Sequence, residues 1–414
     1  MLPIHKKRPA ISVLCLLLSL TVLFFCLAPL DKDSSSIPAG QTAPADVALF
    51  YGGADSPSSP VPLNVGELSA QSAVLMDAAS GQILYAHHAD TPLPMASTTK
   101  IMTALCAIEL ADVRDVITVD NDAVGVEGSS VYLKKGEEMT LLDLLYALLL
   151  ASANDAAAAI AIGTAGSIEA FADYMNDKAK ELHLTNTAFE NPHGLDAQNH
   201  YTTARDLAII AKEVLSHPLL RTIVSTNQIR LAQTNLSEGR TLVNHNKLLR
   251  TYEGAIGLKT GYTRRSGRCL VSAAERNGLT LIAVTLNAPD DWQDHTRLLD
   301  AGFSAYQSKL LCDSGSFRAL VPVIGGKENY VVVGNANTVR LTMPCDDIEI
   351  HTRIELPRFL YPTVSKGDII GRLIFWTESN DDSQEKILAA IDLCAVYTVF
   401  PEKQPNVWQR WFGK

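Results

Sequence analysis

Three short motifs, ordered along the chain, carry residue types suited to nucleophilic attack on an acyl group. They are Ser-x-x-Lys at Ser97 to Lys100, Ser-x-Asn at Ser152 to Asn154, and Lys-Thr-Gly at Lys259 to Gly261. A serine hydroxyl needs a neighbouring base, and a lysine serves as that base when burial and a second cation lower its pKa. The first two patterns occur again at Ser383 and Ser225, so it is the ordered combination that predicts serine acyl transfer.

The Ser-x-x-Lys motif lies at the start of a helix predicted over residues 98–110. A spacing of three places Ser97 and Lys100 on one face, about one turn apart. The helix is apolar nearly all round, which predicts burial, and its N-terminus favours negative charge near Ser97. Ser97 is therefore a candidate nucleophile and Lys100 its base. The alternative is that Ser97 only caps the helix.

The Ser-x-Asn motif follows a strongly apolar helix predicted at 141–150, which Thr140 and Asp143 begin in the manner of a capping box. Because that helix fixes the loop after it, Ser152 is placed to relay a proton and Asn154 to bind a substrate amide. The alternative is that Asn154 only caps the next helix, predicted at 155–164.

Lys-Thr-Gly ends a strand predicted at 255–259, and Thr263 continues its alternation. On an edge strand, Lys259 faces a cleft and supplies a cation, Thr260 supplies a hydroxyl, and the missing side chain of Gly261 lets a substrate backbone approach. Such a site suits a peptide that ends in a carboxylate and adds to the edge like a strand. The alternative is an exposed strand end with a solvated Lys259.

Composition argues against several other classes of protein. A formal net charge of −10 over 414 residues provides no basic stripe for nucleic acid. The seven cysteines include no C-x-x-C pair and the ten histidines no H-E-x-x-H motif, so no metal site is predicted. We expect no cofactor, and we expect most cysteines to be small buried hydrophobes.

The N-terminus reads as an export signal. A basic segment, His5 to Arg8, precedes an apolar run over 11–30 that is close to the length that spans a bilayer. Residues 1–30 are therefore predicted to be a signal peptide or a membrane anchor, and Ala43-Pro44-Ala45 has the form of a cleavage site. Either reading places the protein on the extracytoplasmic face of the cell membrane.

Residues 31–66 are rich in Ser, Pro, Ala and Gly and are predicted to be a flexible linker. Strands at both ends of 67–306, with helices between them, predict one α+β domain whose sheet is built from both ends of the segment. Residues 312–396 carry short β-rich runs that predict a small antiparallel sandwich. The expected strands of the first domain are 72–77, 82–86, 255–259, 269–274 and 279–286, and its expected helices are 98–110, 141–150, 155–164, 168–182 and 204–215.

The last segment, 397–414, is predicted to be an amphipathic tail. Val407, Trp408, Trp411 and Phe412 share one helical face, and such a face with flanking cations suits a membrane surface. The alternative is that these aromatic residues pack on the β-rich domain.

The motifs together are highly specific, and the chain resembles the D-alanyl-D-alanine carboxypeptidases, which are low-molecular-mass penicillin-binding proteins. The resemblance covers about residues 68–303, and the β-rich segment resembles that family's C-terminal domain. It rests on residues 94–100, Gly128-Ser129-Ser130, Leu133-Lys134-Lys135-Gly136, Ser152-Ala153-Asn154-Asp155, Asn191-Pro192-His193-Gly194-Leu195, residues 201–207 and Lys259-Thr260-Gly261-Tyr262-Thr263.

The resemblance implies a penicillin-binding, β-lactamase-like transpeptidase domain, in which an antiparallel sheet carries a helical subdomain, followed by a C-terminal β-sandwich. It implies that Ser97 attacks the bond between the two terminal D-alanines of peptidoglycan stem peptides, with Lys100 as general base, and that β-lactam antibiotics acylate Ser97. Ser152 and Asn154 would relay a proton and contact substrate. The expected substrate-binding residues are Lys259, Thr260, Gly261, Tyr262 and Thr263, and the backbone N–H groups of Ser97 and Tyr262 would form the oxyanion hole.

Two departures from the family pattern and two alternative functions accompany this reading. Ser266 stands where an alanine often precedes Gly267, and residues 287–294 offer no arginine to help Thr260 bind a carboxylate. A β-lactamase would need a glutamate for rapid deacylation, and Glu190-Asn191 only partly fits that pattern. The other alternative is a catalytically silent protein that binds the cell wall.

Overall fold

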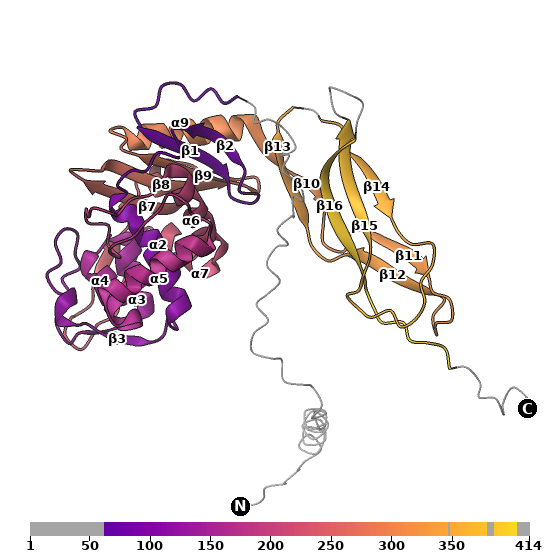
Figure 1. Ribbon diagram of the computed structural model, residues 1–414, viewed down its shortest axis with the longest axis horizontal. Coiled ribbons are helices and arrows are strands. Elements are labelled where there is room, and N and C mark those ends of the chain that lie inside the picture. The colour runs from indigo at the N-terminus through magenta and orange to yellow at the C-terminus, as the bar shows by residue number, and fades with distance from the viewer. Residues whose placement is uncertain (1–61, 347, 379–384, 404–414) are drawn as a thin grey trace, which may run out of the picture. The chain divides into compact units, whose positions relative to one another are not determined.

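The structure is a computed structural model that describes residues 62–346, 348–378 and 385–403 (Figure 1). The predicted export segment, most of the predicted linker and the aromatic part of the predicted tail lie outside these residues. Within them, no helix combines the length and the apolar composition that crossing a bilayer requires.

A five-stranded antiparallel sheet forms the base of the first domain, in the order β2-β1-β9-β8-β7. Its first two strands come from the start of the domain and the others from its end, as predicted. β7 carries Lys-Thr-Gly and is an edge strand, which was also predicted. The strands are β1 (Ser72–Asp77), β2 (Ile83–His87), β7 (Ala255–Thr263), β8 (Gly267–Arg276) and β9 (Leu279–Leu286).

Helices cover both faces of this sheet. On one face Val74, Val271 and Val284 join a large apolar core with the helices between β2 and β7, and on the other Leu75 and Leu281 pack with residues of α9. The helices are α2 (Lys100–Leu110), α3 (Leu141–Leu150), α4 (Asn154–Ala165), α5 (Ile168–Glu181), α6 (Ala204–Ser216), α7 (Pro218–Ser225), α8 (Leu248–Thr251) and α9 (Asp291–Ala305).

The buried helix α2 lies at the centre of the helical part and packs against α3, α4, α5 and α6. The predicted helices are confirmed to within one residue at each end, apart from the start of 98–110. That helix begins only at Lys100, because Ala96–Thr99 form a 3-10 helix, η1. Helices α7, α8 and α9 were not predicted.

Two small hairpins and a second 3-10 helix complete the helical part. The hairpin strands are β3 (Val116–Thr118) with β4 (Glu138–Thr140), and β5 (Gln228–Arg230) with β6 (Thr241–Val243); the 3-10 helix is η2 (Asn121–Ala123). The long connection from β3 to β4 contains the Gly128-Ser129-Ser130 segment.

The C-terminal part is a β structure whose named strands all pair antiparallel, as predicted, and both of its sheets contribute to one apolar core. Its first strand, β10, begins at Tyr306, the last residue assigned to the first domain, and fills residues 307–311, which the sequence left unassigned. A two-stranded sheet pairs β10 (Tyr306–Cys312) with β13 (Val339–Pro344). A five-stranded sheet has the order β11 (Arg318–Pro322), β12 (Tyr330–Asn335), β16 (Glu385–Ala395), β15 (Ile369–Glu378) and β14 (His351–Glu355).

Candidate active site

Ser97 lies in η1, just before α2, in a backbone that is tightly constrained. Ala96 has a left-handed φ of +48°, and the side chain of Thr99 donates to its carbonyl at 2.8 Å. A Cβ on Gly194 would lie 1.9 Å from that same carbonyl, so only glycine fits there. Neither η1 nor α2 has a side-chain cap, so the alternative that Ser97 merely caps the helix is wrong.

Lys100 is fully buried and points at Ser97. Its Nζ lies 2.9 Å from Ser97 Oγ, 2.6 Å from Asn154 Oδ1 and 2.5 Å from the carbonyl oxygen of His193. Burial, together with the nearby charge of Lys259, holds the pKa of Lys100 well below its usual value, although Asp155 opposes the shift. A lysine with a lowered pKa has the neutral form that can take a proton from a serine hydroxyl.

Asn154 is the first residue of α4 but does not cap it, so that alternative is wrong too. Its Oδ1 faces Lys100, while its Nδ2 donates to the carbonyl of Glu127 at 2.5 Å. Ser152 precedes it in the left-handed region, with φ of +59°, and is nearly buried. In the described part of the chain the Ser152 hydroxyl makes no hydrogen bond with Ser97, Lys100 or Lys259, so its relay role stays a prediction.

Thr140 caps α3 as the sequence predicts, because its Oγ1 accepts a hydrogen bond from the backbone N–H of Asp143 at 3.1 Å. The C-terminal end of α3 leads directly into the Ser152 loop, and its Leu150 carbonyl accepts from the N–H of His245 at 3.3 Å. The loop is thus held at both ends by buried structure.

Lys259 is buried on β7, and its Nζ donates to the carbonyl of Thr260 at 2.9 Å. Desolvation lowers the pKa of Lys259 to about 7. Among the described residues no carboxylate forms an ion pair with Lys100 or Lys259. The site therefore holds two buried amines that no carboxylate pairs directly, although the charge of Asp155 reaches Lys100, and this arrangement favours an anionic ligand.

Gly261 keeps β7 close to the nucleophile. A Cβ there would lie 3.0 Å from the backbone nitrogen of Ser97 and 3.1 Å from that of Thr98. The sequence predicts that the missing side chain of Gly261 lets a substrate backbone approach. In the structure, the missing side chain also lets η1 lie close to β7. As a result β7 runs directly beside the N–H of Ser97.

Tyr262 is exposed, whereas the Thr263 hydroxyl is engaged within the chain. Thr263 Oγ1 donates to Asp196 at 3.0 Å and lies 2.9 Å from Ser266 Oγ. Ser266 is buried with its hydroxyl fully used in this turn, which explains why a serine is tolerated at the first departure from the family pattern. A direct substrate contact of Thr263 remains a prediction.

Three features of the site were missed by the sequence reading. The carbonyl oxygen of His193 contacts Lys100, but a backbone contact does not depend on residue type and therefore cannot be predicted from it. Arg268 lies opposite Tyr262 on β8 and pairs with Asp291 at 2.9 Å. A buried ion pair between Glu137 and Arg240 braces the loop beside Asn154. The described residues contain no cluster of three His, Cys, Asp or Glu side chains that would hold a metal ion.

Comparison with known proteins agrees with this geometry. A family model described as D-alanyl-D-alanine carboxypeptidase, of peptidase family S11, matches residues 56–290. The chain is 32% identical over 352 residues to the D-alanyl-D-alanine carboxypeptidase DacF of Bacillus subtilis, covering 82% of this chain and 90% of that protein. It is 30% identical over 339 residues to DacC of Escherichia coli, covering 78% and 83%.

The same fold is found in penicillin-binding protein 5 of Haemophilus influenzae, which superposes with a TM-score of 0.65 at 28% identity. That match covers 83% of this chain and 100% of the other. The two buried amines beside Ser97 therefore lie in a known architecture, and the chain belongs to the D-alanyl-D-alanine carboxypeptidase family of serine hydrolases.

Proposed function

We propose that the protein removes the terminal D-alanine from peptidoglycan stem pentapeptides through an acyl-enzyme on Ser97. Neutral Lys100 takes the proton from Ser97 Oγ, which attacks the carbonyl carbon between the two D-alanines. The C–N bond then breaks, and the departing amine receives a proton from Lys100 by way of Ser152. Water hydrolyses the ester to complete the turnover. The observation that carries the proposal is the 2.9 Å approach of buried Lys100 to Ser97.

The oxyanion of the tetrahedral intermediate would accept hydrogen bonds from the N–H groups of Ser97 and Tyr262. The close packing of Gly261 against the Ser97 nitrogen supports this assignment, because it brings the two backbone segments side by side.

Lys259 and Thr260 would bind the terminal carboxylate of the substrate. Support comes from the lack of a counter-ion for Lys259 within the described residues, since a buried cation gains most from an incoming anion. Arg268 is the candidate for the arginine that residues 287–294 do not offer. Its pairing with Tyr262 places it on the same face of the sheet as Thr260, and its side chain is 42% exposed.

The direct test uses the exported domain and a muramyl pentapeptide that ends in D-Ala-D-Ala, with released D-alanine as the readout. The wild type should release D-alanine, and Ser97→Ala should lose several orders of magnitude in rate. No release by the wild type, or equal release by both proteins, would overturn the proposal. Full biological function of Ser97→Ala in a deletion strain would instead support a catalytically silent wall-binding protein.

We further propose that penicillins acylate Ser97 and stay bound for a long time. A β-lactamase needs a glutamate beside the acyl-enzyme, but the Glu190 carboxylate is exposed and accepts hydrogen bonds from Asn199. Intact-protein mass spectrometry should show a persistent adduct that Ser97→Ala lacks. Rapid penicillin turnover without an adduct would favour the β-lactamase.

We place the enzyme on the extracytoplasmic face of the cell membrane, where its substrate lies. The predicted apolar segment at 11–30 and the aromatic residues of the tail support this location. Liposome co-sedimentation of a protein that lacks residues 1–30 should depend on Trp408 and Trp411. Equal sedimentation of a Trp408→Ala, Trp411→Ala variant would show that the tail is not the anchor.

A further inference from the structure

Tyr132, in the loop between β3 and β4, combines strain with exposure. Its φ is +58°, in the left-handed region, and 83% of its surface is exposed. An aromatic residue in this conformation costs about 1–2 kcal/mol, so the surrounding structure must hold it there. An exposed side chain gains nothing from packing in return.

The backbone around Tyr132 is fixed from one side by Asp155, the residue after Asn154. The buried Asp155 carboxylate accepts from the N–H of Val131 at 3.2 Å and from the N–H of Leu133 at 3.0 Å. It also accepts from the Ser130 hydroxyl at 2.6 Å, and Ser130 Oγ in turn accepts from the N–H of Tyr132 at 2.9 Å.

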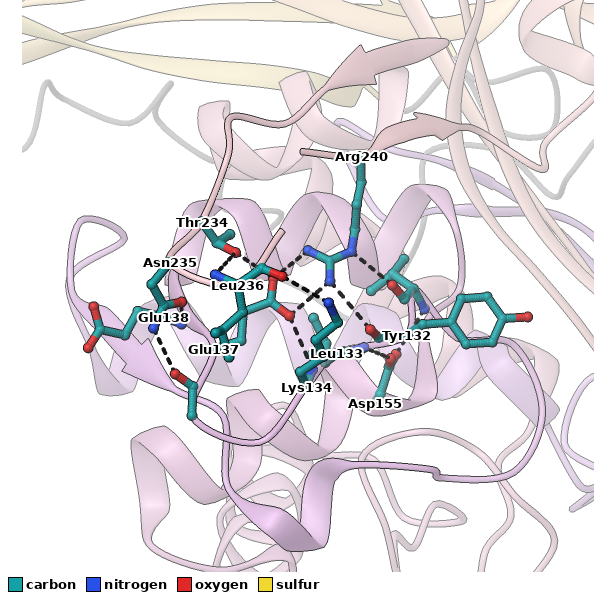
Figure 2. A network of polar contacts seen from close by, with 12 residues as sticks. Tyr132, Leu133, Lys134, Glu137, Glu138, Asp155, Thr234, Asn235, Leu236 and Arg240 are labelled. Carbon is teal, nitrogen blue, oxygen red and sulfur yellow. Dashed lines mark hydrogen bonds and ion pairs between the residues drawn. The ribbon is translucent and has the colours of Figure 1, made fainter. Parts of the chain in front are cut away.

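The backbone is fixed from the other side by Arg240, as Figure 2 shows. Its guanidinium donates to the carbonyl of Val131 at 2.8 Å and to that of Tyr132 at 3.4 Å. The same guanidinium forms a two-bond ion pair with Glu137, at 2.6 and 2.9 Å, and the Glu137 side chain is fully buried. Removing two charges from water costs much of the free energy that their attraction returns. The ion pair is therefore weak evidence for a gain in stability, and it is better explained as fixing one conformation of the loop.

The backbone N–H and the carbonyl of Tyr132 are both hydrogen-bonded within this network, whereas its ring takes no part in it. In Figure 2 the ring points away from the network. The same loop reaches the catalytic motif directly, since the carbonyl of Glu127 accepts from Asn154 Nδ2 at 2.5 Å and that of Ser129 accepts from the Asn154 N–H at 2.7 Å. The ring is thus presented by the loop that holds Asn154, the residue expected to contact substrate.

We propose that Tyr132 is a substrate-contacting residue whose ring packs on the stem-peptide residues that precede the two D-alanines. Arg240 and Glu137 are its positioning residues. The proposed site fixes the direction in which the substrate peptide lies. Lys259 and Thr260 bind its carboxylate end, so its acyl part and the residues before the acyl part lie on the side of Asn154. This inference rests on the proposed function.

The test compares a short acyl-D-Ala-D-Ala peptide with a full stem pentapeptide. Tyr132→Ala should raise KM for the pentapeptide by about threefold to tenfold, the value of one aromatic contact, and leave the short peptide unchanged. Tyr132→Phe should keep wild-type KM, because the contact uses the ring. Penicillin acylation should not change in either variant.

Glycine substitutions separate strain from function. Tyr132→Gly should keep or raise the melting temperature, because glycine adopts φ of +58° without strain, yet should show the same KM defect as Tyr132→Ala. The matched control is His183→Gly, at an exposed left-handed position after α5, which should keep or raise the melting temperature without a KM defect.

The outcomes distinguish the two proposals. If the wild type hydrolyses both peptides and the Tyr132 variants match it, or lose equally on both, the Tyr132 inference is overturned while the proposed function stands. If the wild type hydrolyses neither peptide, the proposed function fails and the Tyr132 inference fails with it.

Discussion

The catalytic domain and the C-terminal β domain are both well-packed, but they differ in what they bury. The first encloses two lysines, three histidines and several carboxylates, among them Lys100, Lys259, His295 and Glu137. Within the described residues after Tyr306, Asn335 is the one buried polar or charged side chain. Burying polar groups costs free energy that an apolar core does not, so the first domain carries a cost in stability that the β domain lacks.

The β domain shows the opposite pattern at its surface. It exposes large apolar side chains that include Leu320, Phe359, Tyr361 and Phe400. The catalytic domain exposes few such residues near its site, and Tyr132 and Tyr262 are the most exposed of them. The predictions below test whether the polar burial belongs to catalysis.

The largest expected effect comes from Lys100→Met, which replaces the buried amine by an apolar side chain of similar length. We expect D-alanine release to fall by at least about three orders of magnitude, because the base is lost. The free energy of unfolding should stay the same or rise, since a desolvated amine is removed. Denaturant unfolding and D-alanine release measure the two effects.

The control for this change lies in the β domain. Lys309→Met, at an exposed position on β10, should leave activity intact and stability within about 0.5 kcal/mol. A Lys100→Met variant that unfolds much more easily while keeping activity would mean that Lys100 serves the fold and not the reaction.

A smaller effect is expected from Arg268→Gln on β8. If Arg268 helps to bind the terminal carboxylate, KM should rise by about tenfold to a hundredfold, the value of a charge-assisted hydrogen bond. The pentapeptide amide, which lacks the carboxylate, should be affected much less. Arg276→Gln, at the other end of the same strand, provides the control and should leave KM unchanged.

The sequence predicted the regular elements well and the polar contacts poorly, for a physical reason. The helix at 141–150 and the strand at 279–286 have buried apolar faces, and both were predicted with their observed bounds. Helix α9 was missed because its first two turns bury Asp291, Asp294 and His295 instead of apolar residues, which hides the helical period.

The same limit applied at the site. The three motifs predicted Ser97, Lys100, Asn154 and Lys259 as site residues, because each motif is local to a few residues, and the structure brings these side chains together around Lys100. Arg240 pairs with Glu137, which lies 103 positions away in the sequence, and no local pattern predicts such a contact. The left-handed backbone of Tyr132 is likewise set by that distant pair and not by its own residue type.

The pH dependence of kcat/KM should reflect the two buried amines. The acid limb should follow Lys100, which must be neutral and whose pKa is held low by burial and by Lys259. The alkaline limb should lie near pH 7, where free Lys259 loses the proton that attracts the carboxylate. In kcat the alkaline limb should move to higher pH, because bound carboxylate stabilises the ammonium form. Identical alkaline limbs in the two profiles would contradict a carboxylate contact of Lys259.

The last prediction concerns stability at acid pH, which we expect to differ between the two domains. Burial lowers the pKa of His193 to about 3, of His200 to about 4 and of His295 to about 3. In the unfolded chain these histidines gain protons below about pH 6.5, while the folded domain keeps them neutral until pH 3 to 4. Above pH 6.5 the three histidines have no effect on stability through protonation. Between pH 6.5 and their folded pKa values each lowers the free energy of unfolding by about 1.4 kcal/mol per pH unit as the pH falls.

Within the described residues the β domain has one histidine, His351, and it lies outside the buried core. Hydrogen exchange between pH 6.5 and pH 4.5 should therefore show protection falling first in residues 62–305 and later in residues 306–403. His295→Gln should flatten the slope in the first region alone, because it removes one proton from the unfolded state. Parallel loss of protection in both regions would show that the buried histidines do not set the acid limit, and that the cost of polar burial lies in the lysines and carboxylates instead.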